Sequence, residues 1–208
     1  MADFSIAAAK TLRLEGKYQK LKKDTGNYNS KGQLVGTNYG ISAKTYEKWI
    51  KRPPTESDMR AITKDIALQI FKVWYWDALK LDNVKDQQTA NFIFDYAIHG
   101  GGPDAVRGTV KAWNSVFKPA IPDTGRMNTT VLKSLNSLDP KKNEILFDRL
   151  KMERIKDIKA RGGDAYDDSL IKRVLMFNYV IIEDLKKKPL KLVFWFIIGF
   201  SIYKFVTN

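Results

Sequence analysis

Two acidic residues near the start of the chain could perform acid–base chemistry. A helix is predicted from about residue 4 to 14, and Glu15 comes eleven residues after Phe4. At about 100° per residue, Glu15 returns to within roughly 20° of Phe4, on the apolar face with Ala8 and Leu12. Desolvation and the negative end of the helix dipole would both keep its carboxyl group protonated, as a general acid for glycoside cleavage requires. The alternative is a Glu at a frayed helix end, paired with a nearby lysine.

The second acidic residue, Asp24, follows a lysine-rich segment that favours its ionised form. Two carboxyl groups held in different protonation states form the acid and base pair of a glycosidase. Thr37 and Asn38 supply short polar side chains that could hold a water molecule. Flat aromatic faces that suit sugar rings come from Tyr18, Tyr28 and Tyr39. The alternative is an Asp-Thr-Gly turn with tyrosines packed on a hairpin.

A second set of polar residues lies at the end of a later predicted helix. His99 precedes three glycines, where a protonated imidazole suits the helix dipole, and Asp95 lies one turn earlier. We expect both to contact substrate, but His99 could instead cap the helix, and Asp95 could make a hydrogen bond in helix packing. The aromatic cluster at 73–76, "VWYW", is interpreted as core rather than as a carbohydrate platform.

The elements that must position these residues are mostly helices. Capping residues and apolar spacing predict helices at about 4–14, 86–99, 128–138, 140–160 and 168–187. Three more helices are predicted to begin at Ser42, at Ser57 and at Pro103. The one that begins at Ser57 continues through Ile62, Ile66 and Ile70. Turn and strand residues between Gly16 and Ser42 predict a small β-hairpin. The fold class expected is therefore all-α, lysozyme-like, with one small β-hairpin.

Composition narrows the function classes. The chain has 208 residues, no cysteine and one histidine, which excludes disulfides and cysteine- or histidine-rich metal sites, and we expect no metal and no cofactor. Its net charge of +13 favours polyanionic partners. No nucleic-acid-reading motif accompanies this charge, so nucleic acid is not an expected partner.

The C-terminal end differs from the rest of the chain. Lysines flank an uncharged, mostly apolar run at 192–203, which favours a membrane anchor over a buried or interfacial terminal helix. The N-terminus lacks the features of a secretory signal peptide. The expected organisation is a catalytic lobe at 1–90, a helical lobe at 91–185 packed on it, and a basic, apolar tail at 186–208.

Together, "EGKYQKLKKDTG" and "TNYGIS" resemble the active centre of phage-type muramidases, in which a Glu, eight residues, an Asp and then a Thr precede a "GI" strand. The chain resembles glycoside hydrolase family 108 more closely, through its "EGGY … GG-T--GI" signature. The similarity continues in "VWYW", "IFDYAIHGGGPDAVRGTVKAWN" and "IPDTGRMNTTVLKSLN" and covers about residues 4–180. The sequence departs from the family pattern at Lys17, His99 and Asn128 and in a longer segment between Asp24 and Thr37.

The resemblance implies an N-acetylmuramidase, of endolysin or secretion-activator type, that cleaves the β-1,4 bond between N-acetylmuramic acid and N-acetylglucosamine. It implies Glu15 as the general acid, with Asp24 and Thr37 positioning the attacking water, and a C-terminal peptidoglycan-binding lobe. Glycan strands of the bacterial cell wall or periplasm are the expected partner, and the protein is expected to be a monomer. The alternative is a lysozyme-like module that binds peptidoglycan without cutting it.

Overall fold

The computed structural model describes residues 1–12, 16–161 and 165–181. Within these ranges the chain is helical, with isolated β-bridges in place of strands, so the all-α prediction is confirmed. The α-helices are α1 (Phe4–Leu12), α2 (Ala43–Ile50), α3 (Glu56–Arg60), α4 (Lys64–Phe71), α5 (Gln87–Gly100), α6 (Gly102–Val116), α7 (Thr129–Asn136), α8 (Pro140–Arg161) and α9 (Ala165–Leu175). Short helical segments of other types are η1 (Thr25–Asn27), η2 (Lys72–Asp77) and η3 (Leu81–Asn83).

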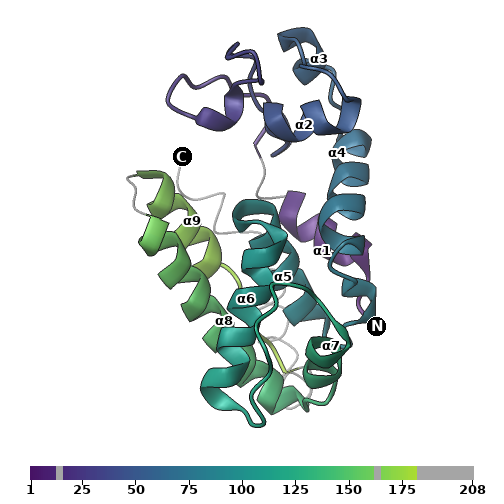
Figure 1. Cartoon of the computed structure of the whole chain (residues 1–208), viewed down its shortest axis with the longest axis vertical. Coiled ribbons are helices and arrows are strands. Elements are labelled where there is room, and N and C mark those ends of the chain that lie inside the picture. Colours follow the sequence, from purple (N-terminus) through teal and green to yellow (C-terminus); the bar gives the residue numbers. More distant parts are fainter. Residues whose placement is uncertain (13–15, 162–164, 182–208) are drawn as a thin grey trace, which may run out of the picture.

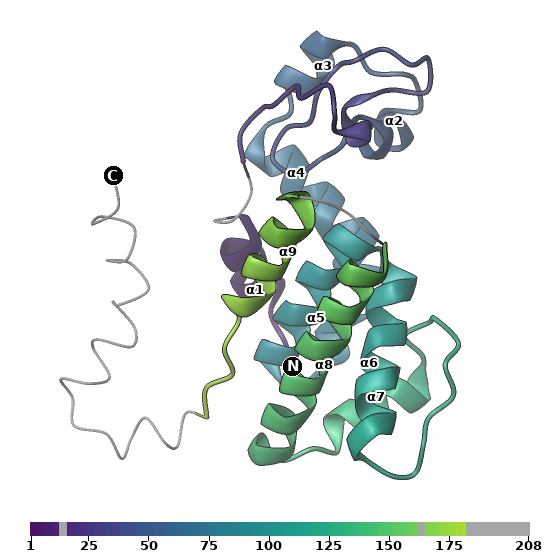
Figure 2. The same cartoon turned by 90° about the vertical axis from the view of Figure 1, so that its left-hand side faces the viewer.

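The helices form two parts that α4 connects (Figures 1 and 2). The upper part contains α2, α3 and an irregular segment, residues 16–41. In the lower part, α5 packs against α1, α6 and α8, and α9 lies along α8. Residue 90, the expected division between two lobes, falls inside α5.

Side-chain caps explain where several helices begin. The side chains of Ser42, Asp86 and Asn128 accept hydrogen bonds from backbone N–H groups three residues later, which satisfies donors that a helix start leaves unpaired. Pro103 lies in the first turn of α6, where its missing N–H costs no helical hydrogen bond. These four starts agree with the sequence predictions.

The prediction of one long helix capped by Ser57 is wrong. Thr55 caps α3 through a reciprocal capping box with Asp58, so Ser57 lies inside the first turn. The helix then ends at Arg60, and Thr63 caps a separate helix, α4. The apolar spacing continues across the break because both helices pack on the same core.

The predicted β-hairpin takes the form of three isolated antiparallel bridges: Gln19 with Thr37, Tyr28 with Leu34, and Asn38 with Ile41. Side chains replace much of the strand pairing. The carboxamide oxygen of Asn29 accepts hydrogen bonds from the backbone of Lys31 and Gln33, and its nitrogen donates to the carbonyl of Pro54.

An aromatic cluster forms the centre of the core. Phe94 on α5 contacts the rings of Phe4, Phe71 and Trp76 edge to face, with centroids 5.6 to 6.3 Å apart. Trp76 is fully buried, and its indole nitrogen donates to Asp82 at 2.5 Å. The interpretation of the "VWYW" segment as core is confirmed for this residue.

The last described helix starts and ends earlier than predicted. The sequence predicts a helix at 168–187, whereas α9 begins at Ala165 and ends at Leu175. Phe177 follows the helix, is fully buried and packs edge to face on Phe92. No helix among the described residues is long and apolar enough to cross a membrane, and the predicted tail at 186–208 lies outside them.

Replacing Phe94 with alanine should lower the free energy of unfolding by about 3–5 kcal/mol, because a cavity would remain among three aromatic neighbours. Urea unfolding measures this change. Ile145→Ala is the control, since Ile145 is 46% exposed on α8 and its loss should change stability by about 0.5 kcal/mol or less. Equal effects of the two substitutions would show that the aromatic cluster is not the centre of the core.

Candidate active site

Gln19 joins the two halves of the irregular segment. Its backbone N–H and carbonyl pair with those of Thr37, at 2.9 Å in both directions. Its side-chain nitrogen donates to the carboxylate of Asp24 at 2.8 Å and to Asn27 at 3.0 Å. One residue therefore bonds both Asp24 and Thr37, although these two are thirteen positions apart in the sequence.

Both carboxylate oxygens of the half-buried Asp24 are oriented by hydrogen bonds. Oδ1 accepts from the backbone N–H of Gly26 at 2.8 Å, which makes Asp24 the cap of η1, and Oδ2 accepts from Gln19. An ionised carboxylate can accept about four hydrogen bonds, so acceptor positions are left for a further donor. Gln19 thus contacts both Asp24, through its side chain, and Thr37, through its backbone. That the two residues form one catalytic site stays a prediction.

The hydroxyl group of Thr37 is buried, and no described residue gives it a hydrogen-bond partner. A buried hydroxyl left unpaired costs about 1–3 kcal/mol. A buried, unpaired hydroxyl in the segment that carries Asp24 suits a site that binds a polar group.

Tyr18 lies between two other residues of the upper part. Its hydroxyl donates to the carbonyl of Val35 at 3.1 Å, and the guanidinium carbon of Arg60 lies 3.9 Å from the ring centroid. A Cβ atom at Gly36 would come within 2.7 Å of the ring. Burial and the nearby carboxylate of Glu56 raise the pKa of Tyr18 above its ordinary value. These contacts occupy ring surface that was predicted to stack on sugar.

Glu56 ties the irregular segment to α3. Lys20 and Arg60 both form ion pairs with its carboxylate, and their hydrogen bonds lower the pKa of Glu56 to about 2. The orientation of the residues around Tyr18 therefore depends on α3 as well as on the irregular segment.

The other predicted sugar contacts in the upper part also have internal partners. The Tyr28 hydroxyl donates to the carbonyl of Lys22 at 3.1 Å. Asn38 is buried, and its side-chain nitrogen donates to the carbonyl of Met59 at 3.0 Å, at the end of α3. Tyr39 has a φ of 47° in the tight turn that follows. Their substrate contacts stay predictions.

Asp95 and His99 belong to the lower part. Asp95 is 5% exposed and forms an ion pair with Arg173 of α9, with nitrogen-to-oxygen distances of 2.5 to 3.0 Å. His99 lies in the last turn of α5, with Nδ1 3.0 Å from the carbonyl oxygen of Asp95. The contacts of Asp95 correspond to the helix-packing alternative.

Glu15, the predicted general acid, lies outside the described residues, in the gap between Leu12 at the end of α1 and Gly16. Gln19, Arg60 and Arg173 are not among the residues predicted from the sequence. The sequence carries no local signal for these three, since two are ordinary surface residue types and Arg173 acts on a residue 78 positions away.

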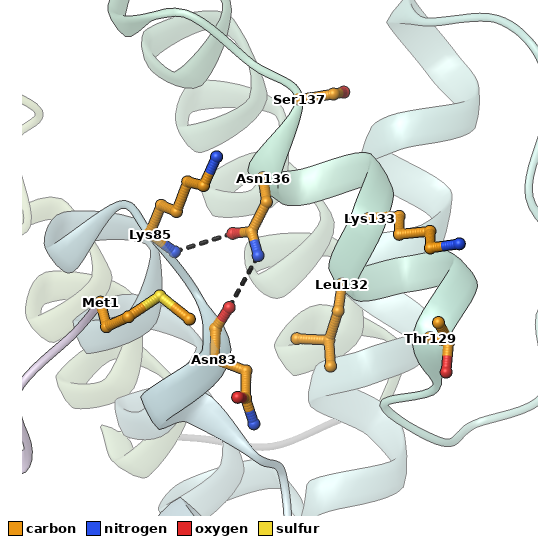
Figure 3. A pocket seen from close by; sticks show the side chains of 8 residues that line it. All are labelled: Met1, Asn83, Lys85, Thr129, Leu132, Lys133, Asn136 and Ser137. Atoms are coloured by element: carbon orange, nitrogen blue, oxygen red, sulfur yellow. Dashed lines mark hydrogen bonds between the residues drawn. The ribbon is translucent and has the colours of Figure 1, made fainter.

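A cavity of about 460 Å³ lies elsewhere, between η3 and α7, and is lined by none of the predicted site residues (Figure 3). The side chain of Asn136 accepts from the backbone N–H of Lys85 at 2.8 Å and donates to the carbonyl of Asn83 at 2.7 Å. These bonds join α7 to the segment after η3. The side-chain amide of Asn136 therefore holds two parts of the fold together.

Comparisons with known proteins show which family part of the chain matches and which solved structure has a similar fold. The model of the family glycosyl hydrolase 108 matches residues 8–101, a range that includes Glu15, Asp24 and Thr37. The solved structure of Brucella abortus SagA is similar with a TM-score of 0.64 and 22% sequence identity, and the match covers 85% of this chain and 96% of that one. No curated protein shows significant similarity to the chain.

The helical fold, with its irregular polar segment, is thus of the lysozyme-like class. Residues 8–101, slightly less than half of the chain, match glycosyl hydrolase family 108. This family match implies a lysozyme-like hydrolysis of peptidoglycan.

Replacing Gly36 with alanine should disrupt the site, because the new Cβ would lie 2.7 Å from the carbonyl oxygen of Gln19. The bridge between Gln19 and Thr37 should open, and hydrogen–deuterium exchange should show loss of protection at their amides. Gly32→Ala is the matched control: its φ of 72° resembles the 94° of Gly36, but no atom lies within 4 Å of the new Cβ. It should cost only the roughly 1–2 kcal/mol of a left-handed backbone. Similar exchange in both variants would contradict close packing at Gly36.

Proposed function

We propose that the protein is an N-acetylmuramidase, which hydrolyses the β-1,4 bond between N-acetylmuramic acid and N-acetylglucosamine in peptidoglycan. Glu15 acts as the general acid that protonates the leaving glycosidic oxygen in an oxocarbenium-like transition state. Support for this role comes from the position of Glu15 in the sequence, three residues after the end of α1 and inside the range that matches the family.

The observation that carries the proposal is the junction at Gln19. It holds the carboxylate of Asp24 and the buried hydroxyl of Thr37 on adjoining stretches of backbone. Asp24 either directs a water molecule at the anomeric carbon or stabilises the developing positive charge, and Thr37 orients the same water. Fixed hydrogen-bonding groups of this kind lower a barrier because they need no reorganisation during the reaction.

The charge of the chain supports action at the cell wall. A net charge of +13 favours association with a wall that carries carboxylates and phosphates. In this proposal the catalytic groups belong to residues 8–101, and the helices that follow contribute a peptidoglycan-binding surface.

Glu15→Gln should reduce the release of reducing ends from purified peptidoglycan by about 100-fold or more, because the amide cannot donate the proton. Glu144→Gln is the control; Glu144 is exposed on α8, and its loss should leave the rate unchanged. Sedimentation with peptidoglycan should be the same for both variants and the unmodified protein. Binding without release of reducing ends by the unmodified protein would instead identify a non-catalytic binding module.

Thr37→Val tests whether the buried hydroxyl serves the reaction. Removing an unpaired hydroxyl should leave stability unchanged or raise it by about 1 kcal/mol, whereas the rate of hydrolysis should fall about 10-fold or more. Thr89 offers a matched control, since its buried hydroxyl also has no partner among the described residues. Thr89→Val should change stability in the same direction and leave hydrolysis unchanged. Equal rates for the two variants would remove Thr37 from the mechanism.

A further inference from the structure

A second cavity, of about 360 Å³, lies between the end of α6, α7 and the start of α8. Trp113 and Phe117 line one side of it, with ring centroids 4.9 Å apart. The indole N–H of Trp113 donates to the carbonyl of Pro119 at 3.0 Å, so the loop after α6 holds this aromatic wall in place. The cavity is large enough for a small ligand or for one group of a larger one.

Three lysines line the same cavity: Lys118 in the loop after α6, Lys133 on α7 and Lys142 on α8. None of the lining residues is acidic. Nζ of Lys142 lies 3.4 Å from Asp139, whose other oxygen accepts the backbone N–H of Lys142 at 2.9 Å. Within the described part of the chain, neither Lys118 nor Lys133 forms an ion pair. Two of the three charges in the cavity are therefore not neutralised by a neighbouring carboxylate.

A hollow lined by charges of one sign attracts counter-charges more strongly than a flat surface does. Its apolar walls have a low dielectric constant, so they concentrate the electric field inside the hollow. Ammonium groups on flexible stems also bind carboxylates or phosphates without demanding one orientation. The cavity therefore favours an anionic group as its ligand.

The lining also indicates which kind of anion fits. Trp113 is only 5% exposed, so it offers little ring surface on which a nucleobase or a sugar could stack. None of the lining residues is among the exposed large apolar side chains, which an interfacial membrane contact would need. A short, flexible chain that carries carboxylates can reach the lysines without either kind of contact.

We propose that this cavity binds carboxylates of the short peptides attached to the glycan strands of peptidoglycan, with Lys118, Lys133 and Lys142 as the anion-binding residues. This inference rests on the proposed substrate. The helix α7 lies at the end of the lower part that is farthest from α2 and α3 (Figures 1 and 2). The cavity is thus separate from the candidate active site, and it holds the substrate without touching the reacting bond.

The first test combines Lys118→Gln, Lys133→Gln and Lys142→Gln in the full chain. The Kd for purified peptidoglycan, freed of phosphate polymers and measured by sedimentation, should rise about 10-fold at low salt, and the difference should shrink as salt screens the charges. The rate of reducing-end release at saturating peptidoglycan should not change, because these residues do not take part in the chemical step.

The matched control combines Lys64→Gln, Lys111→Gln and Lys159→Gln. These three lysines are exposed and line neither cavity, so the variant loses the same net charge from other surfaces. Its Kd should rise about 2-fold or less. Equal losses in the two triple variants would overturn the inference, because binding would then depend on net charge alone.

The second test removes the charge from the substrate. Peptidoglycan whose carboxylates have been converted to amides should bind the unmodified protein about 10-fold more weakly, whereas the cavity variant should bind both forms equally. Equal binding of both forms by the unmodified protein would overturn the inference. So would lysines of the cavity that serve only duplex DNA or anionic lipid vesicles. An unmodified protein that binds through the cavity but releases no reducing ends would instead overturn the proposed hydrolysis and leave this inference standing.

Discussion

The structure depends on the burial of α5 from all sides. Nine consecutive residues, Thr89 to Ala97, are buried, a pattern typical of a helix surrounded by other elements. Polar groups on such a helix need internal partners, because leaving them unpaired is costly. Asn91 accepts a hydrogen bond from Gln87, and Asp95 has Arg173. Because Asp95 is buried and Arg173 is its partner, the need to pair this carboxylate also helps to hold α9 against α5.

The upper part is organised differently. Its irregular segment has few buried apolar side chains and is held by hydrogen bonds from Gln19, Asn27, Asn29 and Asn38 to the backbone and to one another. Bonds of this kind are directional, so they can fix a carboxylate and a hydroxyl in a set geometry without a regular sheet. The catalytic proposal depends on this directional scaffold and not on the aromatic core.

Local signals in the sequence predicted much of the fold. Helix starts at Ser42, Asp86 and Asn128 follow from capping chemistry that acts within three residues. The choice of Ser57 as a cap failed because Thr55 and Thr63 compete for the same role, and local sequence does not decide among three hydroxyl residues. The spacing of apolar residues also did not show that α9 ends at Leu175.

Of the candidate site, the sequence analysis selected Asp24 and Thr37 but not Gln19, the residue that bonds both. Gln19 is one of many polar residues in its segment, and its side chain acquires a role only when the chain folds back on itself. Arg173 likewise acquires its ion pair with Asp95 only when α9 lies beside α1 and α5. Long-range polar contacts of this kind follow no periodic pattern, so they cannot be predicted from a single sequence.

The way in which Phe92 is covered has a consequence for the boundaries of the folding unit. Its ring packs on Phe147 of α8 and on Phe177 beyond α9, both outside the stretch shared with the family. A fragment cut to that shared stretch would expose this face of α5 to water and leave the charge of Asp95 without its counterion. The stretch that matches the family is thus not an independent folding unit, because the later helices shield part of its core.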